Sequence, residues 1–356
     1  MPYLPILELT RGGIVETVHF GAVAVVNSHG VLIASYGDPA TETFMRSSAK
    51  PFQIMPFLLH GGQTAYGLTE REIAVICASH SGTDDHVATV RGIQAKTGVV
   101  ESDLLCGTHL PPHKPTVEAL RQRGESPTPN RHNCSGKHTG MVAHARLHGL
   151  PYDDYINPAH PIQQEIIQAF CEMCEVSSAQ VTIGIDGCSA PNFAISLHHA
   201  ALGFARLSDP ARLTPDRAEV CQTIFRAMTA NPEMVGGPDS FDTHLMQTAE
   251  GRILSKGGAE GYMGIGIAPG LLGDGSPGLG ITFKISDGDL APHIRSNDQH
   301  GTARPAIALE ILRQLGILNS AVHTILADYG PTFELRNWRK LLVGQARPCF
   351  ELNHKR

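Results

Sequence analysis

Strand-like segments lie near both ends of this chain, and a long stretch with helical periodicity separates them. The predicted strands cover residues 14–26, 31–36, 252–255, 262–267 and 279–285. A turn at 27–30 joins the first two strands into a hairpin, and a helix over 303–315 follows the last one. We therefore expect an α+β fold, an α/β sandwich whose antiparallel sheet is built from both ends of the chain around a helical middle.

The middle region carries several helix start and stop signals. Thr69 and Glu72 form a capping box, which predicts a helix from residue 70 onward. The other predicted helices cover 84–98 with Asp84 as cap, 136–149, 161–174, and a segment that starts at Pro215 with Thr214 as cap. Residues 107–131 are rich in proline and polar groups, so we expect a long loop. The apolar run 181–185 reads as a buried strand.

The composition sets the broad class of the protein. With 356 residues, 42% of them hydrophobic, the chain can bury a large core, and we expect a single catalytic region, 1–356. Discontinuous subdomains are expected at 1–66 plus 240–356, which hold the sheet, and at 67–239, which are mainly helical. The net charge of -6, with dispersed basic residues, argues against nucleic acid or an anionic membrane as partner. No cationic leader precedes a long apolar run, so the cytoplasm is the expected location.

The run from Arg46 to Lys50 places a hydroxyl and an amine three residues apart, at Ser47 and Lys50. Residues at i and i+3 meet on a helix surface, so Lys50 is expected within reach of Ser47 as its activating base. Pro51 is compatible with this helix if Ser47 is its cap. The helix N-terminus then adds partial positive charge near the hydroxyl. A solvated helix is the alternative interpretation.

Further segments concentrate reactive side chains. Ser79 lies in a Ser-His-Ser-Gly sequence and can relay a proton, or the sequence is an ordinary turn. Cys134 and His138 are four residues apart, the spacing of two zinc ligands on a helix, and Lys137 reaches the same ion only as the neutral amine. Cys188 follows the run 181–185 and can complete a site with Cys134. Otherwise both cysteines are buried thiols.

A second lysine, Lys256, closes a predicted strand and is followed by Gly257 and Gly258. The glycines let a substrate approach the backbone, and the lysine can keep Lys50 neutral or stabilise an oxyanion. The alternative is a glycine hairpin with a solvated lysine. The pair Cys171 and Cys174 lies on an amphipathic helix without a second pair and is expected to be structural. Single histidines show no metal spacing and stay unassigned; among them are His60, His109, His144 and His160.

Five segments carry a more specific signal: RSSAKPFQ, ASHSG, RHNCSGKHTGM, GIDGCSAPN and SKGGAEG. In this order, and over essentially the whole chain, they resemble the rhizobial-type (class 3) L-asparaginases of the asparaginase II family. The resemblance implies a fold related to serine β-lactamases and glutaminases. It also implies hydrolysis of L-asparagine to L-aspartate and ammonia, and we expect a homodimer.

The resemblance also assigns residues. It implies a catalytic set of Ser47, Lys50, Ser79 and Lys256, with Ser47 as nucleophile. It implies a zinc site of Cys134, Lys137 and Cys188, in which Zn²⁺ orients the substrate. Asp186 matches a carboxylate next to the substrate or metal, and we place Ser48, Gly257 and Gly258 with it in substrate binding.

Three other functions are compatible with these segments. A penicillin-recognising serine acyl-enzyme or peptidase uses the same serine–lysine chemistry. A zinc hydrolase can be built on Cys134, Lys137, His138 and Cys188, although catalytic zinc more often has histidine-rich ligation. A zinc-stabilised small-molecule binding module needs no catalysis at all. Asparagine and glutamine differ by one methylene, which alters binding by roughly 1–3 kcal/mol, so the sequence leaves that choice open.

Overall fold

The computed structural model describes residues 1–289, 302–318 and 324–355. The chain forms two compact units, a sheet unit and a helical unit. The sheet unit comprises Met1–Met45, Ile195–Asp209 and Ser255–Arg356, and the helical unit comprises Arg46–Ala194 and Pro210–Leu254. These bounds differ from the expected subdomains because residues 46–66 and 240–254 belong to the helical unit and residues 195–209 belong to the sheet unit.

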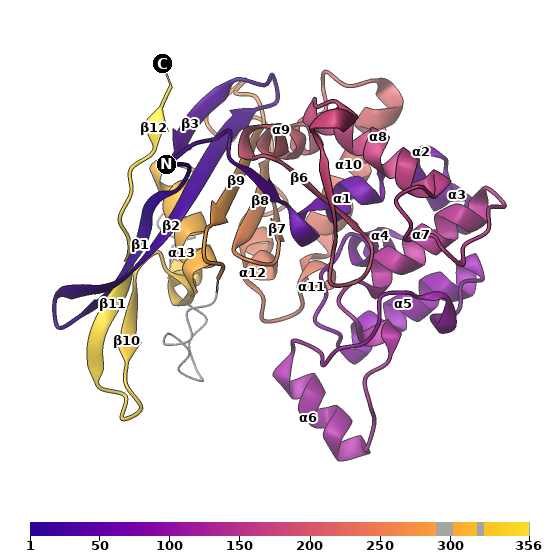
Figure 1. Cartoon of the computed structure of the whole chain (residues 1–356), viewed down its shortest axis with the longest axis horizontal. Helices are drawn as coiled ribbons and strands as arrows, with labels where there is room; N and C mark the ends of the chain where they lie inside the picture. The colour runs from indigo at the N-terminus through magenta and orange to yellow at the C-terminus, as the bar shows by residue number, and fades with distance from the viewer. Residues whose placement is uncertain (290–301, 319–323, 356) are drawn as a thin grey trace. The chain divides into compact units, whose positions relative to one another are not determined.

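The sheet unit is built on an antiparallel sheet with strands in the order β10-β11-β1-β2-β9-β8-β7, and β3 joins β2 to β12 at its side. The strands are β1 (Leu4–Arg11), β2 (Ile14–Asn27), β3 (Leu32–Tyr36), β7 (Ile253–Gly257), β8 (Tyr262–Ile267), β9 (Leu279–Ile285), β10 (Phe333–Arg336), β11 (Leu342–Pro348) and β12 (Asn353–His354). Figure 1 shows the indigo N-terminal strands beside the yellow C-terminal ones, and Leu7 pairs with Pro348. The predicted α+β class, with an antiparallel sheet from both ends of the chain, is confirmed.

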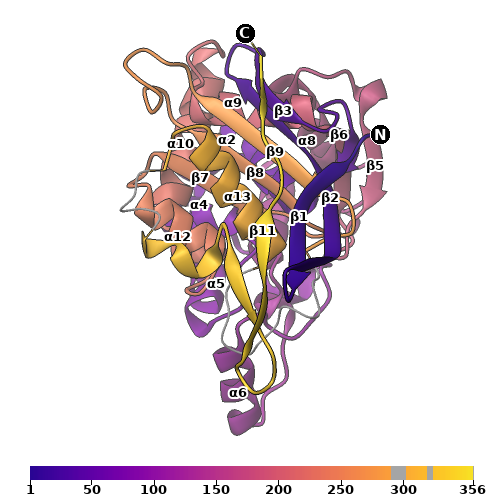
Figure 2. The ribbon, with the colours of Figure 1, turned by 90° about the vertical axis from the view of Figure 1, so that its left-hand side faces the viewer.

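Two helices cover this sheet. Helix α9 (Leu197–Ser208) packs on β2, β8 and β9. A Cβ on Gly280 would lie 1.8 Å from the Ala201 carbonyl oxygen, so glycine is required for this close approach. Helix α13 (Ala303–Gln314) contacts β1, β8 and β11, and Figure 2 shows it in front of the sheet. The unit also contains a short strand, β4 (Glu42–Phe44), and a 3-10 helix, η5 (Ala327–Tyr329).

The helical unit packs around α4. Its α-helices are α1 (Lys50–Gln53), α2 (Met55–Leu59), α3 (Gly62–Tyr66), α4 (Glu70–Ile76), α5 (Asp84–Thr97), α6 (Lys114–Arg123), α7 (Ser135–Leu147), α8 (Pro161–Cys174), α10 (Pro215–Ala230), α11 (Pro232–Val235) and α12 (Phe241–Thr248). Helix α4 contacts α5, α7, α10 and α11. A Cβ on Gly136 would lie 2.1 Å from the Val75 carbonyl oxygen, so α7 approaches α4 through a glycine. This contact fixes the start of α7, where the cysteine and lysine candidates lie.

Several predicted elements have the observed bounds, and others do not. Helix α8 covers the predicted residues, and α4 begins at its Thr69 capping box. The predicted long loop at 107–131 is wrong in part, because α6 starts with a proline in its first turn and ends at left-handed Gly124. Residues 182–185 form β5 (Thr182–Ile185), but this strand is not buried, since the side chain of Ile185 is 64% exposed.

The described residues contain no helix that is both long enough and apolar enough to cross a lipid bilayer.

Candidate active site and metal centre

Ser47 lies inside a short 3-10 helix, η1 (Arg46–Ala49), which runs directly into α1. The residue that precedes α1 is Ala49, which makes no side-chain cap, so the expected role of Ser47 as helix cap is wrong. The helical segment begins at Arg46 with the 3-10 turn, one residue before the start at Ser47 that the position of Pro51 indicated. Pro51 still occupies the first turn of α1, where its missing N–H costs no hydrogen bond. The Ser47 side chain is partly exposed, as a nucleophile that meets substrate requires.

Arg46, the residue before Ser47, has a left-handed backbone with φ of 52°. This conformation costs a non-glycine residue roughly 1–2 kcal/mol. Two contacts hold it: the Arg46 backbone N–H donates to Asn192 Oδ1 (3.0 Å), and its Nε donates to Asp186 Oδ1 (2.9 Å). Both partners come from the hairpin of β5 and β6 (Pro191–Ser196). The hairpin therefore fixes the backbone that presents Ser47.

Lys50 is buried, with 1% of its surface exposed. Its Nζ donates to the Ala78 carbonyl (2.5 Å), to Ser79 Oγ (2.9 Å) and to the Asn133 carbonyl (3.2 Å). The close serine partner of Lys50 is therefore Ser79, and the contact with Ser47 expected from the i, i+3 spacing is not among these bonds. The three acceptors match the three N–H groups of a lysine ammonium, and a deprotonated Lys50 would turn its lone pair to the Ser79 hydroxyl.

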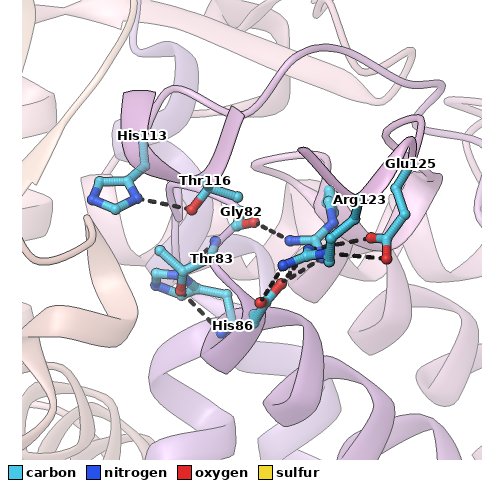
Figure 3. A network of polar contacts seen from close by, with 9 residues as sticks. Gly82, Thr83, His86, His113, Thr116, Arg123 and Glu125 are labelled. Carbon is cyan, nitrogen blue, oxygen red and sulfur yellow. Dashed lines mark hydrogen bonds and ion pairs between the residues drawn. The ribbon is translucent and has the colours of Figure 1, made fainter. Parts of the chain in front are cut away.

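The turn that carries Ser79 is held on several sides. The Ser79 backbone N–H donates to the Val235 carbonyl (3.0 Å), and Gly82 takes a left-handed φ of 69°. Figure 3 shows the network around Gly82, in which its carbonyl accepts a 2.9 Å bond from the Arg131 guanidinium. Thr83 caps α5 by accepting from the His86 backbone N–H, so the prediction of Asp84 as cap is wrong. These contacts fix the Ser79 hydroxyl relative to Lys50.

Cys134, Lys137 and Cys188 form a second cluster. Cys134 precedes α7, Lys137 lies in its first turn, and Lys137 Nζ donates to Cys188 Sγ at 3.1 Å. The hydrogen bond from Cys134 and the charge of Lys137 outweigh burial and hold the pKa of Cys188 well below its usual range. Burial opposes charge on Lys137, but the facing Cys188 and Cys134 sulfurs outweigh it and raise the Lys137 pKa. These opposite directions favour the thiolate form of Cys188 facing the ammonium form of Lys137.

This donor set fits a soft divalent ion such as Zn²⁺. Two thiols and one amine converge on one buried place, and thiolate sulfur is a preferred zinc ligand. Lys137 must give up its proton to bind, so an ion would replace that proton between the amine and the Cys188 sulfur. His138 Nε2 is buried without a hydrogen-bond partner among the described residues, while its Nδ1 bonds to the Tyr155 hydroxyl (2.5 Å). An additional donor is thus available to the same cluster.

The two clusters adjoin through the chain itself. Lys50 Nζ binds the carbonyl of Asn133, the residue before Cys134. Asp186, which anchors Arg46, lies two residues before Cys188. The helical unit therefore brings together most predicted site residues, namely Ser47, Ser48, Lys50, Ser79, Cys134, Lys137, Asp186 and Cys188.

The remaining predicted site residues, Lys256, Gly257 and Gly258, belong to the sheet unit. Lys256 Nζ donates to the Gly257 carbonyl (2.8 Å), and the Gly258 N–H donates to the Tyr262 carbonyl (2.9 Å) at the hairpin that follows β7. The roles predicted for these three residues stay predictions.

Three residues that hold the site together are not predicted by the sequence. Arg46, Asn133 and Asn192 support Ser47 and Lys50 by contacts between segments far apart in the chain. A left-handed arginine has no sequence signal. The two asparagines lie inside two of the motifs described above, and this position is the one sequence signal that points to them.

Comparison with known proteins identifies the family. The family model described as L-asparaginase II matches residues 7–348, and no curated protein matches the chain. Among solved structures, a Bacillus subtilis glutaminase in covalent complex with 5-oxo-L-norleucine is 12% identical, with 75% of this chain and 80% of that chain covered and a TM-score of 0.31. A Bacillus glutaminase in 4.3 M NaCl is also 12% identical, with 75% and 83% covered and a TM-score of 0.33. The match over residues 7–348 confirms the resemblance drawn from the five segments: the chain belongs to the L-asparaginase II family of amidohydrolases.

Proposed function

We propose that this chain hydrolyses L-asparagine to L-aspartate and ammonia, with Ser47 as nucleophile and Lys50 as base. The observation that supports this most strongly is the buried Lys50 amine, which contacts Ser79 Oγ. Lys50 itself follows Ser47 by one helical turn. Ser79 then passes the proton of Ser47 to Lys50. Family membership supports the amide substrate, and the choice of asparagine over glutamine is part of the proposal.

The chemistry runs in two balanced steps. Neutral Lys50 takes the Ser47 proton through Ser79 while Ser47 Oγ bonds to the side-chain amide carbon of asparagine. The C–N bond breaks, Lys50 returns the proton to the leaving nitrogen, and ammonia departs from an aspartyl ester on Ser47. Water then attacks the ester carbon and gives its proton to Lys50. The ester C–O bond breaks, and Ser47 regains the proton. Backbone N–H groups beside Ser47 would hold the oxyanion in both steps.

The other residues bind and position. Cys134, Lys137 and Cys188 would hold a Zn²⁺ ion, which when bound supplies positive charge that orients the substrate. Asp186 acts through Arg46, because its carboxylate is bonded to that guanidinium and to the Gly187 N–H (2.8 Å). We place Ser48, Gly257 and Gly258 in substrate binding, and Lys256 as the cation that keeps Lys50 neutral.

A second candidate makes Ser79 the nucleophile. Ser79 Oγ is the hydroxyl that Lys50 contacts directly, at 2.9 Å, and this is the geometry of an activated nucleophile and its base. Both serine side chains are partly exposed, and the backbone that Asn192 and Asp186 hold before Ser47 favours Ser47 instead.

The test is ammonia release from L-asparagine and L-glutamine by the wild type and by three variants. Ser47→Ala is expected to lose at least about 10⁴-fold in kcat. Ser79→Ala, which removes only the relay, should retain more activity. The exposed Ser178→Ala serves as the matched control and should behave as wild type. Near-wild-type turnover by Ser47→Ala would defeat the assignment, and no ammonia release from either amide would defeat the proposed substrate class. Acylation of Ser47 by a penicillin without amide hydrolysis would favour the penicillin-recognising alternative.

A further inference from the structure

A group of three histidines and one glutamate lies at the far end of α7, in the same helical unit. Its members are His60, His144, His148 and Glu165. His60 follows the last residue of α2, His144 and His148 lie at the C-terminal end of α7, and Glu165 lies in α8. These three helices contact one another, and Figure 1 shows their ribbons together. None of the four residues takes part in the proposed hydrolysis.

We propose that these four side chains form a binding site for a divalent transition-metal ion of the Zn²⁺ class, separate from the Cys134–Lys137–Cys188 cluster. Each residue offers one donor atom, and the four donor atoms all lie within 4.8 Å of one another. His144 and His148 have the i, i+4 spacing that places two ligands on one helix face. The sequence analysis considered the histidines singly and so missed this pair.

The distances between donor atoms match a tetrahedral site. His60 Nδ1 lies 2.6 Å from His148 Nε2 and 3.9 Å from Glu165 Oε2, and His144 Nε2 lies 3.1 Å from Glu165 Oε2. Ligands about 2.05 Å from a zinc ion at tetrahedral angles are about 3.3 Å apart, within the range of these distances. An ion at the centre therefore needs only small side-chain movements.

Two of the donor atoms are buried without a hydrogen bond. His144 Nε2 and Glu165 Oε2 face each other at 3.1 Å, yet neither has a hydrogen-bond partner among the described residues. The His144 side chain is only 2% exposed. Buried polar atoms are normally satisfied, and an ion between these two would satisfy both.

The surroundings favour a bound cation. Phe57, Met141 and Ile166 enclose the inner side of His144. The C-terminal end of α7 adds partial negative charge, and Glu165 adds a full one. His60 and His148 are exposed, so an ion can enter from solvent.

The experiment measures bound Zn²⁺ after dialysis in a Cys134→Ser/Cys188→Ser protein, in which the thiol cluster is disabled. We expect about one equivalent of Zn²⁺ and an increase in the unfolding temperature when Zn²⁺ is added. Adding His148→Asn or Glu165→Gln should abolish both effects, and His29→Asn, a change of an exposed histidine in the sheet unit, should leave both unchanged. Absence of Zn²⁺ from the cysteine variant, or retention of Zn²⁺ by both ligand variants, would overturn the proposal.

A second measurement covers the case in which the cysteine variant does not fold. Co²⁺ added to the wild-type protein reports ligand type, because thiolate ligands give a sulfur-to-metal charge-transfer band and imidazole ligands do not. We expect a d–d spectrum of a tetrahedral ion without sulfur, which is lost in His148→Asn while the thiolate band remains. If His148→Asn leaves the whole Co²⁺ spectrum unchanged, the four residues do not bind metal.

Discussion

Arg46 shows how single residues support the candidate nucleophile from outside the chemistry. Its left-handed backbone is held by Asp186 and Asn192, so the cost of that conformation is offset by contacts from the β5–β6 hairpin. The sequence marks Asp186 by its position after a strand-like run, and its predicted place beside the substrate or metal stays a prediction. The Asp186 carboxylate binds the arginine beside Ser47, which no spacing within one motif reveals.

Asp186→Asn is expected to lower kcat about 10-fold or more while KM changes less, because the substitution loosens Arg46 and misplaces Ser47 rather than removing a substrate contact. Steady-state kinetics of ammonia release measure both constants. Asp153→Asn, an exposed carboxylate in the same unit, is the control. A rise in KM with unchanged kcat would instead indicate that Asp186 binds substrate.

His86 links the rigidity of the Ser79 turn to pH. Burial lowers its pKa from 6.5 to about 4, against the hydrogen bond that His86 Nε2 donates to the Glu233 backbone carbonyl and the charge of Asp85, while Arg71 and His113 lower it further. Between pH 6.5 and about 4, His86 is therefore protonated in the unfolded chain but not in the folded one. The stability that is present above pH 6.5 is lost as the pH falls toward 4. At pH 5 this loss is about 2 kcal/mol.

Urea unfolding of the wild type at pH 7 and pH 5 measures this loss directly. In His86→Gln the fall in the free energy of unfolding between these pH values should be smaller by about 2 kcal/mol. The exposed His29→Gln should leave the fall unchanged. An equal fall in the wild type and His86→Gln would contradict the argument.

At the level of helices and strands, the contact between α4 and α7 positions the start of α7, which carries Cys134 and Lys137. The helical periodicity and capping signals predict both helices, and the glycine of the Ser-Gly-Lys sequence is visible in the motif. The reason for a glycine at position 136 is not visible in the sequence, because it comes from the Val75 carbonyl on another helix. For the same reason the sequence predicts most of the central sheet strands, whose alternation is local, yet misses β1, β10 and β11 and the exposure of β5, which depend on distant partners.

Gly136→Ala is expected to destabilise the protein by roughly 1–3 kcal/mol, because the new methyl group would overlap the Val75 carbonyl. Gly92→Ala is the matched helical control. A Cβ at that position meets only Glu72 Oε1 at 3.4 Å, so alanine should be neutral or stabilising by up to about 1 kcal/mol. Thermal unfolding of both variants measures the difference. Equal stability of the two variants would refute the close-packing argument.

For the complete chain, the predicted catalytic set is divided between the units, since Lys256 belongs to the sheet unit and Ser47, Lys50 and Ser79 belong to the helical unit. The antiparallel sheet and helical middle follow from the order of local patterns. The allocation of 46–66, 195–209 and 240–254 to units does not, because it depends on long-range packing. The predicted homodimer and the predicted zinc ion at the cysteines also remain proposals.

Lys256→Met is expected to lower kcat of asparagine hydrolysis strongly, because the predicted catalytic set includes the Lys256 charge. Lys256→Arg keeps the charge and should retain more activity. Steady-state ammonia release measures both variants, and wild-type kcat in Lys256→Met would remove Lys256 from the proposed set.

The decisive measurement is the mass and site of the covalent intermediate. The wild type is mixed with L-asparagine, quenched in acid within one turnover, digested and mapped by mass spectrometry. The account predicts one aspartyl group esterified to Ser47 and none on Ser47→Ala protein treated in the same way. An aspartyl ester on Ser79, or hydrolysis without an adduct on either serine, would contradict it.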